Sequence, residues 1–172
     1  MLCTKAEIRF QHQLIYALPI EEQYVTILQM DNGGIIQLYQ LTKIGNDFSD
    51  LILVATHYCE QGKMVKILPE IHESELEARK LIMPGVKGNK YPDLLIDGLL
   101  TEVESTDKFY NIANRITKGS IQANRVVIVY KTLIHEISIN KTISILFHQH
   151  QTLENITILN DKGVMLLNAK RP

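Results

Sequence analysis

The chain has 172 residues, the length of about one ordinary domain, and 45% of them are hydrophobic, enough for a core of normal size. A formal net charge of −1 argues against a protein that binds polyanions through its overall charge, although it leaves room for a nucleic-acid enzyme with a local basic patch. The two cysteines, Cys3 and Cys59, do not form a disulfide framework and do not have the spacing of a metal site. The sequence shows no membrane span and no signal peptide. We therefore expect a cytoplasmic protein without a membrane partner.

The first predicted elements are a hairpin and a helix. Tyr24–Met30 and Ile35–Gln40 are rich in β-forming residues and flank an Asn-Gly turn, whose residues tolerate the positive φ that tight hairpins need. A helix is expected over about Ser49–Gln61, where apolar residues recur at helical spacing on one side. Asp47 and Ser49 can cap its start.

The rest of the chain continues to alternate between strand-like and helix-like segments. In chain order we expect a strand at Met64–Leu68, a polar helix at Glu73–Ile82, a hairpin at Leu94–Ser105 and a helix at Asp107–Asn124. These are followed by a buried strand at Val126–Tyr130, a helix at Ile139–His150, and a last hairpin formed by Ile156–Leu159 and Val164–Leu167. This order predicts a single domain over residues 1–172 with an α+β fold, in which helices pack on one mixed or antiparallel sheet.

The hairpin around Asp97-Gly98 is acidic. If these two residues form the turn, Asp93 faces Glu102 across the strands, and Glu104, two residues further on, shares their face. Opposed like charges destabilise a strand pair, so a metal ion, a proton transfer or a nearby cation is the usual reason for such a cluster. The alternative is a solvated acidic face, but two leucines on the same face argue that it is not wholly exposed.

Two groups of polar residues flank this hairpin. On the helix that follows it, Asn111, Arg115, Lys118 and Gln122 fall within a sector of about 60°. Their positive charges and amides suit phosphate oxygens, although a plain solvated helix face explains the stripe equally well. In the loop before the hairpin, Lys87 and Lys90 lie near glycines, which indicates either a phosphate-contacting loop or an ordinary basic surface loop.

Several of these segments, taken together, resemble a known family. They are Gly62–Glu70, Lys90–Gly98, Glu102–Ser105, Asn111–Gln122 and Val126–Val129. The string resembles the C-terminal tRNase domain of contact-dependent inhibition toxins, in the barnase–EndoU–colicin–RelE superfamily of metal-independent RNases; related domains occur in bacterial phage and mobile-element proteins. The resemblance covers about residues 46–130, which would form a core like that of RNase toxins.

The resemblance implies an RNA-cleaving, tRNase-like toxin domain that needs no cofactor and has RNA, and an immunity or antitoxin protein, as partners. The implied catalytic residues are Asp93, Glu102, Glu104, Arg115 and Lys118. From the loop and the helix stripe we expect Lys87, Lys90, Asn111 and Gln122 to bind the substrate. Cleavage without a metal needs a base, an acid and a cation on the phosphate, for which we expect Glu102 or Glu104 as base and Arg115 and Lys118 as phosphate contacts.

Two alternatives stay open. Many relatives carry Lys where this chain has Glu104, which removes a cation and is consistent with a catalytically silent module that binds a protein or nucleic-acid partner. The Pro-Asp…Glu-x-Glu arrangement also resembles the metal-dependent Pro-Asp-(Asp/Glu)-x-Lys nucleases, in which Asp93 and Glu102 would hold a divalent metal.

Overall fold

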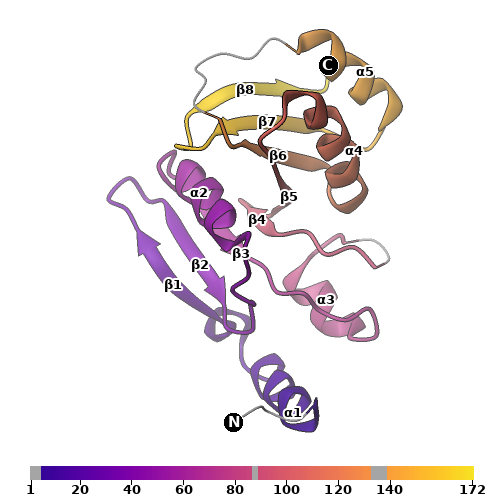
Figure 1. The fold of residues 1–172 in the computed structure, drawn as a ribbon. Coiled ribbons are helices and arrows are strands. Elements are labelled where there is room, and N and C mark those ends of the chain that lie inside the picture. The colour runs from indigo at the N-terminus through magenta and orange to yellow at the C-terminus, as the bar shows by residue number, and fades with distance from the viewer. Residues whose placement is uncertain (1–4, 87–88, 133–138) are drawn as a thin grey trace.

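The computed structural model describes residues 5–86, 89–132 and 139–172. Within them the strands form one sheet, and helices cover both of its faces (Figure 1). The strands are β1 Tyr24–Gln29, β2 Ile35–Tyr39, β3 Met64–Ile67, β4 Leu94–Ile96, β5 Leu99–Thr106, β6 Arg125–Tyr130, β7 Asn155–Asn160 and β8 Met165–Lys170. The α-helices are α1 Lys5–Tyr16, α2 Phe48–Cys59, α3 Leu76–Ile82, α4 Ile112–Gln122 and α5 Asn140–Gln149, and two short 3₁₀ helices are η1 Ile20–Gln23 and η2 Phe109–Asn111. None of the helices described is long and apolar enough to cross a bilayer.

The sheet is mixed, and its eight strands lie side by side in the order of the chain. Hairpins pair β1 with β2, β4 with β5, and β7 with β8, and β3 is antiparallel to β4. The pairs β2–β3, β5–β6 and β6–β7 are parallel, and a helix connects the two strands of each: α2, α4 and α5 in turn. The predicted α+β fold with one mixed sheet is therefore confirmed.

The central strand β6 separates two apolar cores. Val126 and Ile128 pack with residues of α4, α5 and β7 on one face, whereas Val127 and Val129 pack with α2, β3 and β4 on the other. Both sets are buried because successive side chains of a strand point to opposite faces. A strand that is buried on both faces has a continuous run of apolar residues, as Val126–Tyr130 does in this sequence.

The Asp97-Gly98 turn has the predicted geometry. Both residues have positive φ, 48° for Asp97 and 82° for Gly98, as a tight two-residue hairpin requires. The register that follows pairs Ile96 with Leu99 and Leu94 with Thr101, as expected. The side chain of Asp97 is also fixed by β3, because its Oδ1 accepts a hydrogen bond from the Met64 N–H at 3.0 Å.

The starts of two predicted helices were wrong, and one helix was missed. The helix expected from Asp107 begins only at Ile112. The residues before it form a turn, in which the Thr106 hydroxyl accepts a hydrogen bond from the Lys108 N–H, and then the 3₁₀ helix η2. The helix expected from Glu73 begins at Leu76, because the His72 ring and carbonyl first accept hydrogen bonds in a tight turn. Helix α1 was not predicted at all.

Candidate active site

The candidate site lies where the sheet has a gap beside β5. Strand β4 pairs with β5 only as far as Thr101, whereas β5 continues to Thr106 and pairs there with β6 on its other side. Residues from both faces of the sheet therefore reach one cavity, of about 270 Å³, along the open edge of β5. We call this the site cavity; it is lined by Asp47, Asp50, Leu51, Asp93, Glu102, Val103, Glu104, Ser105, Arg115 and Lys118.

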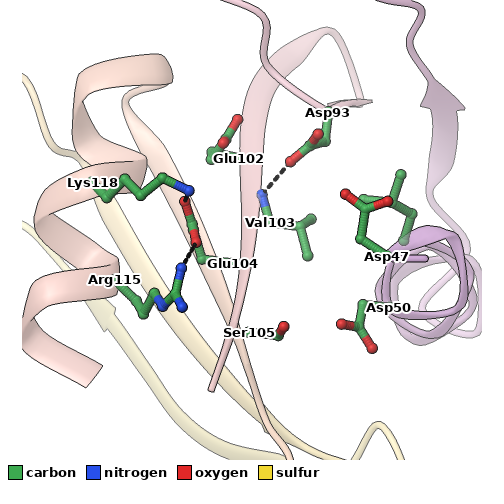
Figure 2. A pocket seen from close by; sticks show the side chains of 10 residues that line it. Asp47, Asp50, Asp93, Glu102, Val103, Glu104, Ser105, Arg115 and Lys118 are labelled. Atoms are coloured by element: carbon green, nitrogen blue, oxygen red, sulfur yellow. Dashed lines mark hydrogen bonds and ion pairs between the residues drawn. The ribbon is translucent and has the colours of Figure 1, made fainter. Parts of the chain in front are cut away.

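Asp93 and Glu102 form a buried acidic pair in the site cavity. Asp93 lies just before β4, and its Oδ2 accepts a hydrogen bond from the Val103 N–H at 2.9 Å, which replaces part of the missing strand pairing (Figure 2). Glu102 is only 8% exposed, and its Oε2 atom is buried without a hydrogen-bond partner among the described residues. A buried polar atom without a partner is costly, so it marks a position where a proton or a cation is expected.

Both carboxyl groups of the pair favour the protonated form. Burial raises the pKa of Glu102 to about 10, and the negative charges of Asp93 and Glu104 act in the same direction. Burial also raises the pKa of Asp93 to about 7, although the hydrogen bond from Val103 opposes the shift. At neutral pH and without a bound cation, the pair therefore holds at least one proton.

Glu104 has a different environment, because helix α4 supplies it with two cations. Its Oε2 accepts a hydrogen bond from Arg115 Nη1 at 3.1 Å, and its Oε1 lies 2.6 Å from Lys118 Nζ (Figure 2). The Glu104 side chain is 5% exposed, whereas those of Arg115 and Lys118 are 40% and 64% exposed. The two cations therefore neutralise a buried carboxylate and still reach solvent at the cavity.

Helix α2 brings two more carboxylates from the opposite face of the sheet. Asp47 and Asp50 line the site cavity from the start of this helix, on the other side of β5 from Arg115 and Lys118 (Figure 2). Asp47 is at the N-cap position, but its side chain makes no capping hydrogen bond, so the predicted capping role is not seen. Asp50 is largely buried and pairs with Lys131 at 2.9 Å.

A glycine allows helix α4 to approach β5 closely. A Cβ atom at Gly119 would lie 2.8 Å from Val126 Cγ1 and 3.4 Å from Glu102 Cγ. Real Cβ atoms do not approach carbon atoms as closely as 2.8 Å, so any larger residue would have to displace the helix or repack Val126. The close packing at Gly119 thus helps to place Lys118 over the strand that carries Glu102 and Glu104.

The predicted catalytic residues come together, but the predicted substrate-binding residues do not. Asp93, Glu102, Glu104, Arg115 and Lys118 all line the site cavity. The others are elsewhere: Asn111 lines a neighbouring cavity with Arg115, Lys90 and Gln122 line a third cavity near the hairpin turn, and Lys87 lies outside the described residues.

Gln122 has a structural contact rather than a place in the site. Its Oε1 accepts a hydrogen bond from the Tyr91 N–H at 3.1 Å and so ties the end of α4 to the loop before β4. The predicted stripe is divided between two elements, because Asn111 ends η2 and α4 begins at Ile112, and its two ends border different cavities. Only Arg115 and Lys118, the middle pair of the stripe, reach the carboxylates.

Sequence reasoning missed Asp50, Lys131, Ser105 and the site role of Asp47. Asp50 is a buried carboxylate on an otherwise apolar helix face, which is an unusual place for a charge. This was the one signal in the sequence that pointed to α2. Lys131 carries no comparable signal, because a lysine after a buried strand is ordinary.

The buried pair of Asp93 and Glu102 has the oxygen ligands that a divalent cation needs. The described residues contain no cluster of three or more His, Cys, Asp or Glu side chains arranged around a metal position. Mg²⁺, however, is commonly held by one or two carboxylates, with water and substrate phosphates completing its shell. Asp93 and Glu102, with the unpartnered Oε2, fit that smaller requirement.

One family model matches part of the chain. Residues 90–164 match the model of the contact-dependent growth inhibition CdiA C-terminal domain family. This segment contains Asp93, Glu102, Glu104, Arg115 and Lys118, whereas Asp47 and Asp50 precede it. No curated protein matches the chain.

Among solved structures, the chain is similar to the CdiA-CT/CdiI toxin and immunity complex from Burkholderia pseudomallei. The identity is 16% and the TM-score 0.43, over 78% of this chain and 98% of that one. The family-model match confirms, over residues 90–164, the resemblance of this chain to the C-terminal domains of contact-dependent inhibition toxins.

Proposed function

We propose that the chain is a nuclease that cleaves RNA, with tRNA as the substrate class that the family resemblance suggests. The observation that carries the proposal is the buried Asp93–Glu102 pair at the open edge of β5, beside two solvent-reaching cations on α4. Perturbed carboxyl groups that converge in a cavity are typical of functional sites, and the cations beside them have the chemistry to contact a phosphate.

Arg115 and Lys118 are the proposed phosphate contacts. Both are held in place by Glu104 and both keep part of their surface exposed at the cavity. Glu104 stands where many relatives carry Lys, but Lys118 Nζ lies 2.6 Å from its carboxylate and so supplies a cation at nearly the same place. In this proposal Glu104 positions the two cations and does not itself exchange protons.

The geometry favours the metal-dependent form of the reaction. In the metal-free route a base and an acid act on opposite sides of the phosphorus, whereas Asp93 and Glu102 are neighbours, and Glu104 is occupied by its two cations. A divalent cation would be held by Asp93 and Glu102, and when bound it would supply Lewis-acid activation of a phosphate oxygen and of a water molecule. Arg115 and Lys118 would orient the substrate and offset its negative charge.

Cleavage of total tRNA by the purified chain tests the proposal. We expect cleavage in Mg²⁺ or Mn²⁺, loss of cleavage in chelator, and recovery when the metal is restored. Asp93→Asn and Glu102→Gln should each abolish it, whereas Glu77→Gln, at an exposed carboxylate of α3, should not.

The substrate and the chelator together separate the possible outcomes. Cleavage that persists in chelator and requires the 2′-hydroxyl supports the metal-independent route that the resemblance implies. Absence of cleavage of RNA and DNA under all metal conditions supports the catalytically silent module. An immunity protein is the partner that the resemblance suggests, and it would be expected to suppress cleavage when it is added.

A further inference from the structure

A second cavity continues from the site along β5 and has the opposite charge balance. This flanking cavity, of about 460 Å³, shares Ser105 and Arg115 with the site cavity and is otherwise lined by Thr106, Asp107, Lys108, Asn111 and Lys131. Three of its side chains are basic and one is acidic, whereas the site cavity has five carboxylates and two basic groups. Arg115 and Lys131 pair with Glu104 and Asp50 but keep 40% and 46% of their side-chain surface exposed, so together with Lys108 they can still attract a polyanionic strand.

Two exposed aromatic residues lie in the sequence between residues that line the flanking cavity. Phe109 and Tyr110, which are 50% and 72% exposed, lie between the lining residues Lys108 and Asn111 in the one-turn helix η2. Two adjacent exposed rings offer an apolar surface that a partner can cover. The two rings follow Lys108 directly in the sequence. Single-stranded nucleic acids bind to such combinations, because rings stack on bases while basic groups contact the backbone.

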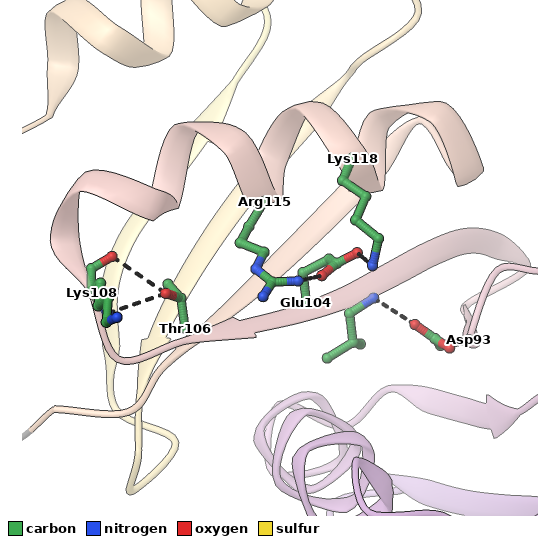
Figure 3. A network of polar contacts seen from close by, with 7 residues as sticks. Asp93, Glu104, Thr106, Lys108, Arg115 and Lys118 are labelled. Atoms are coloured by element: carbon green, nitrogen blue, oxygen red, sulfur yellow. Dashed lines mark hydrogen bonds and ion pairs between the residues drawn. The ribbon is translucent and has the colours of Figure 1, made fainter.

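The turn that carries the rings is held in one conformation. The Thr106 hydroxyl accepts a hydrogen bond from the Lys108 N–H at 3.1 Å (Figure 3). The Asn111 N–H donates to the Lys108 carbonyl at 3.0 Å. A platform that is already ordered loses little entropy when a ligand binds. Lys108 has no ion-pair partner among the described residues, so its ammonium group is available to a phosphate.

We propose that Phe109 and Tyr110 form a stacking platform for unpaired bases of the substrate, next to the cleavage site, with Lys108 and Lys131 at the adjoining phosphates. The inference rests on the proposed nuclease function and narrows it: the substrate segment that enters the site is single-stranded. Thr106 is four residues from Glu102 along β5, or about 13 Å at 3.3 Å per residue, so the platform holds nucleotides that flank the scissile bond.

Fluorescence gives a direct test, because the chain contains no tryptophan. Tyr110→Trp introduces a single reporter on the platform. Phe10→Trp introduces one at another exposed aromatic position, in α1 and away from the flanking cavity (Figure 1). The probe is a single-stranded 2′-O-methyl RNA in chelator, which blocks attack by the 2′-hydroxyl and any metal-dependent cleavage. We expect the probe to quench the tryptophan fluorescence of the Tyr110→Trp variant and to leave that of the Phe10→Trp control unchanged. Quenching should be absent with the same strand in a duplex or with an abasic strand.

Affinity gives the second test. Phe109→Ala and Tyr110→Ala should each weaken binding of the single strand on the order of five- to 150-fold, the effect of one base–aromatic stack, whereas Tyr110→Phe and Phe10→Ala should not. Unchanged affinity in both alanine variants, or an unquenched Tyr110→Trp variant at saturating strand, overturns the platform.

The two proposals fail separately. If the wild type cleaves RNA but the Phe109→Ala/Tyr110→Ala variant binds and cleaves single strands with unchanged Kd and KM, the platform is wrong and the nuclease stands. If the wild type cleaves nothing, the nuclease proposal fails. The quenching and affinity measurements, which need no cleavage, then decide the platform on their own.

Discussion

The carboxylate of Glu104, which is almost completely buried, lies 2.6 Å from the ammonium group of Lys118. Arg115 approaches its other oxygen at 3.1 Å. A buried carboxylate with two cationic partners can lose one of them and keep a counter-charge, but it cannot lose both without leaving an uncompensated charge in the sheet. The arrangement therefore predicts non-additive effects on stability.

Arg115→Ala and Lys118→Ala should each lower the free energy of unfolding by about 1 kcal/mol or less, because both side chains are partly exposed. The double variant should lose about 3–5 kcal/mol, the cost of stranding a buried charge. Urea unfolding at pH 7 measures all three. Adding Glu104→Gln to the double variant should restore most of the loss, and an additive double variant would show that Glu104 does not depend on the pair.

The same two substitutions should lower cleavage more than stability. Each removes a proposed charge-assisted contact to the phosphate, so we expect a loss in kcat/KM on the order of a hundred- to a thousandfold. Lys80→Ala, at an exposed lysine of α3, is the matched control and should be neutral. Activity that survives in the folded Arg115→Ala and Lys118→Ala variants would remove these residues from the mechanism.

The part of the site that follows from local rules could be predicted from the sequence. The Asp97-Gly98 turn fixes the register of the hairpin, and the register places Glu102 and Glu104 two residues apart on one face. A helix that connects two adjacent parallel strands must pack back on the sheet, which brings Arg115 and Lys118 over β5.

The rest of the site depends on tertiary packing. Asp50 precedes the hairpin by more than forty residues, and nothing local specifies that the N-terminal end of its helix reaches the open edge of β5. That edge exists because β4 has only three residues, and strand ends are poorly defined by composition alone. The position of Gln122 beyond the site has a similar cause, because its partner Tyr91 is in a loop.

Glu102→Gln should stabilise the fold at neutral and alkaline pH while it removes activity. The pKa of Glu102 is raised from 4.5 to about 10 by burial, so its native environment favours the protonated form. The stability that the wild type derives from this group is complete below pH 4.5 and is lost as the pH rises toward 10. The amide resembles the protonated acid at every pH, so the advantage of the variant should grow over that range.

Urea titrations in chelator at pH 5 and pH 8 check this expectation. The variant should be more stable than the wild type by about 1 kcal/mol or more at pH 8 and by less at pH 5. Glu77→Gln, at an exposed carboxylate, should show no such trend. A variant that is destabilised equally at both pH values would mean that Glu102 is ionised and well compensated in the fold.

Gly119→Ala should separate the position of helix α4 from its chemistry. The added Cβ would lie 2.8 Å from Val126 Cγ1, so the helix must move or Val126 must repack. Although alanine favours helix by about 1 kcal/mol over glycine, overpacking of this kind costs about 1–3 kcal/mol, so we expect a net loss of stability together with weaker cleavage.

Val126→Ala removes the clashing methyl groups, and in the Gly119→Ala/Val126→Ala variant the two substitutions should cost less together than the sum of their separate effects. Urea unfolding and kcat/KM of the two single variants and the double variant measure this coupling. Additive losses would show that α4 does not depend on its close approach to Val126, and that Gly119 has no part in placing Lys118 at the site.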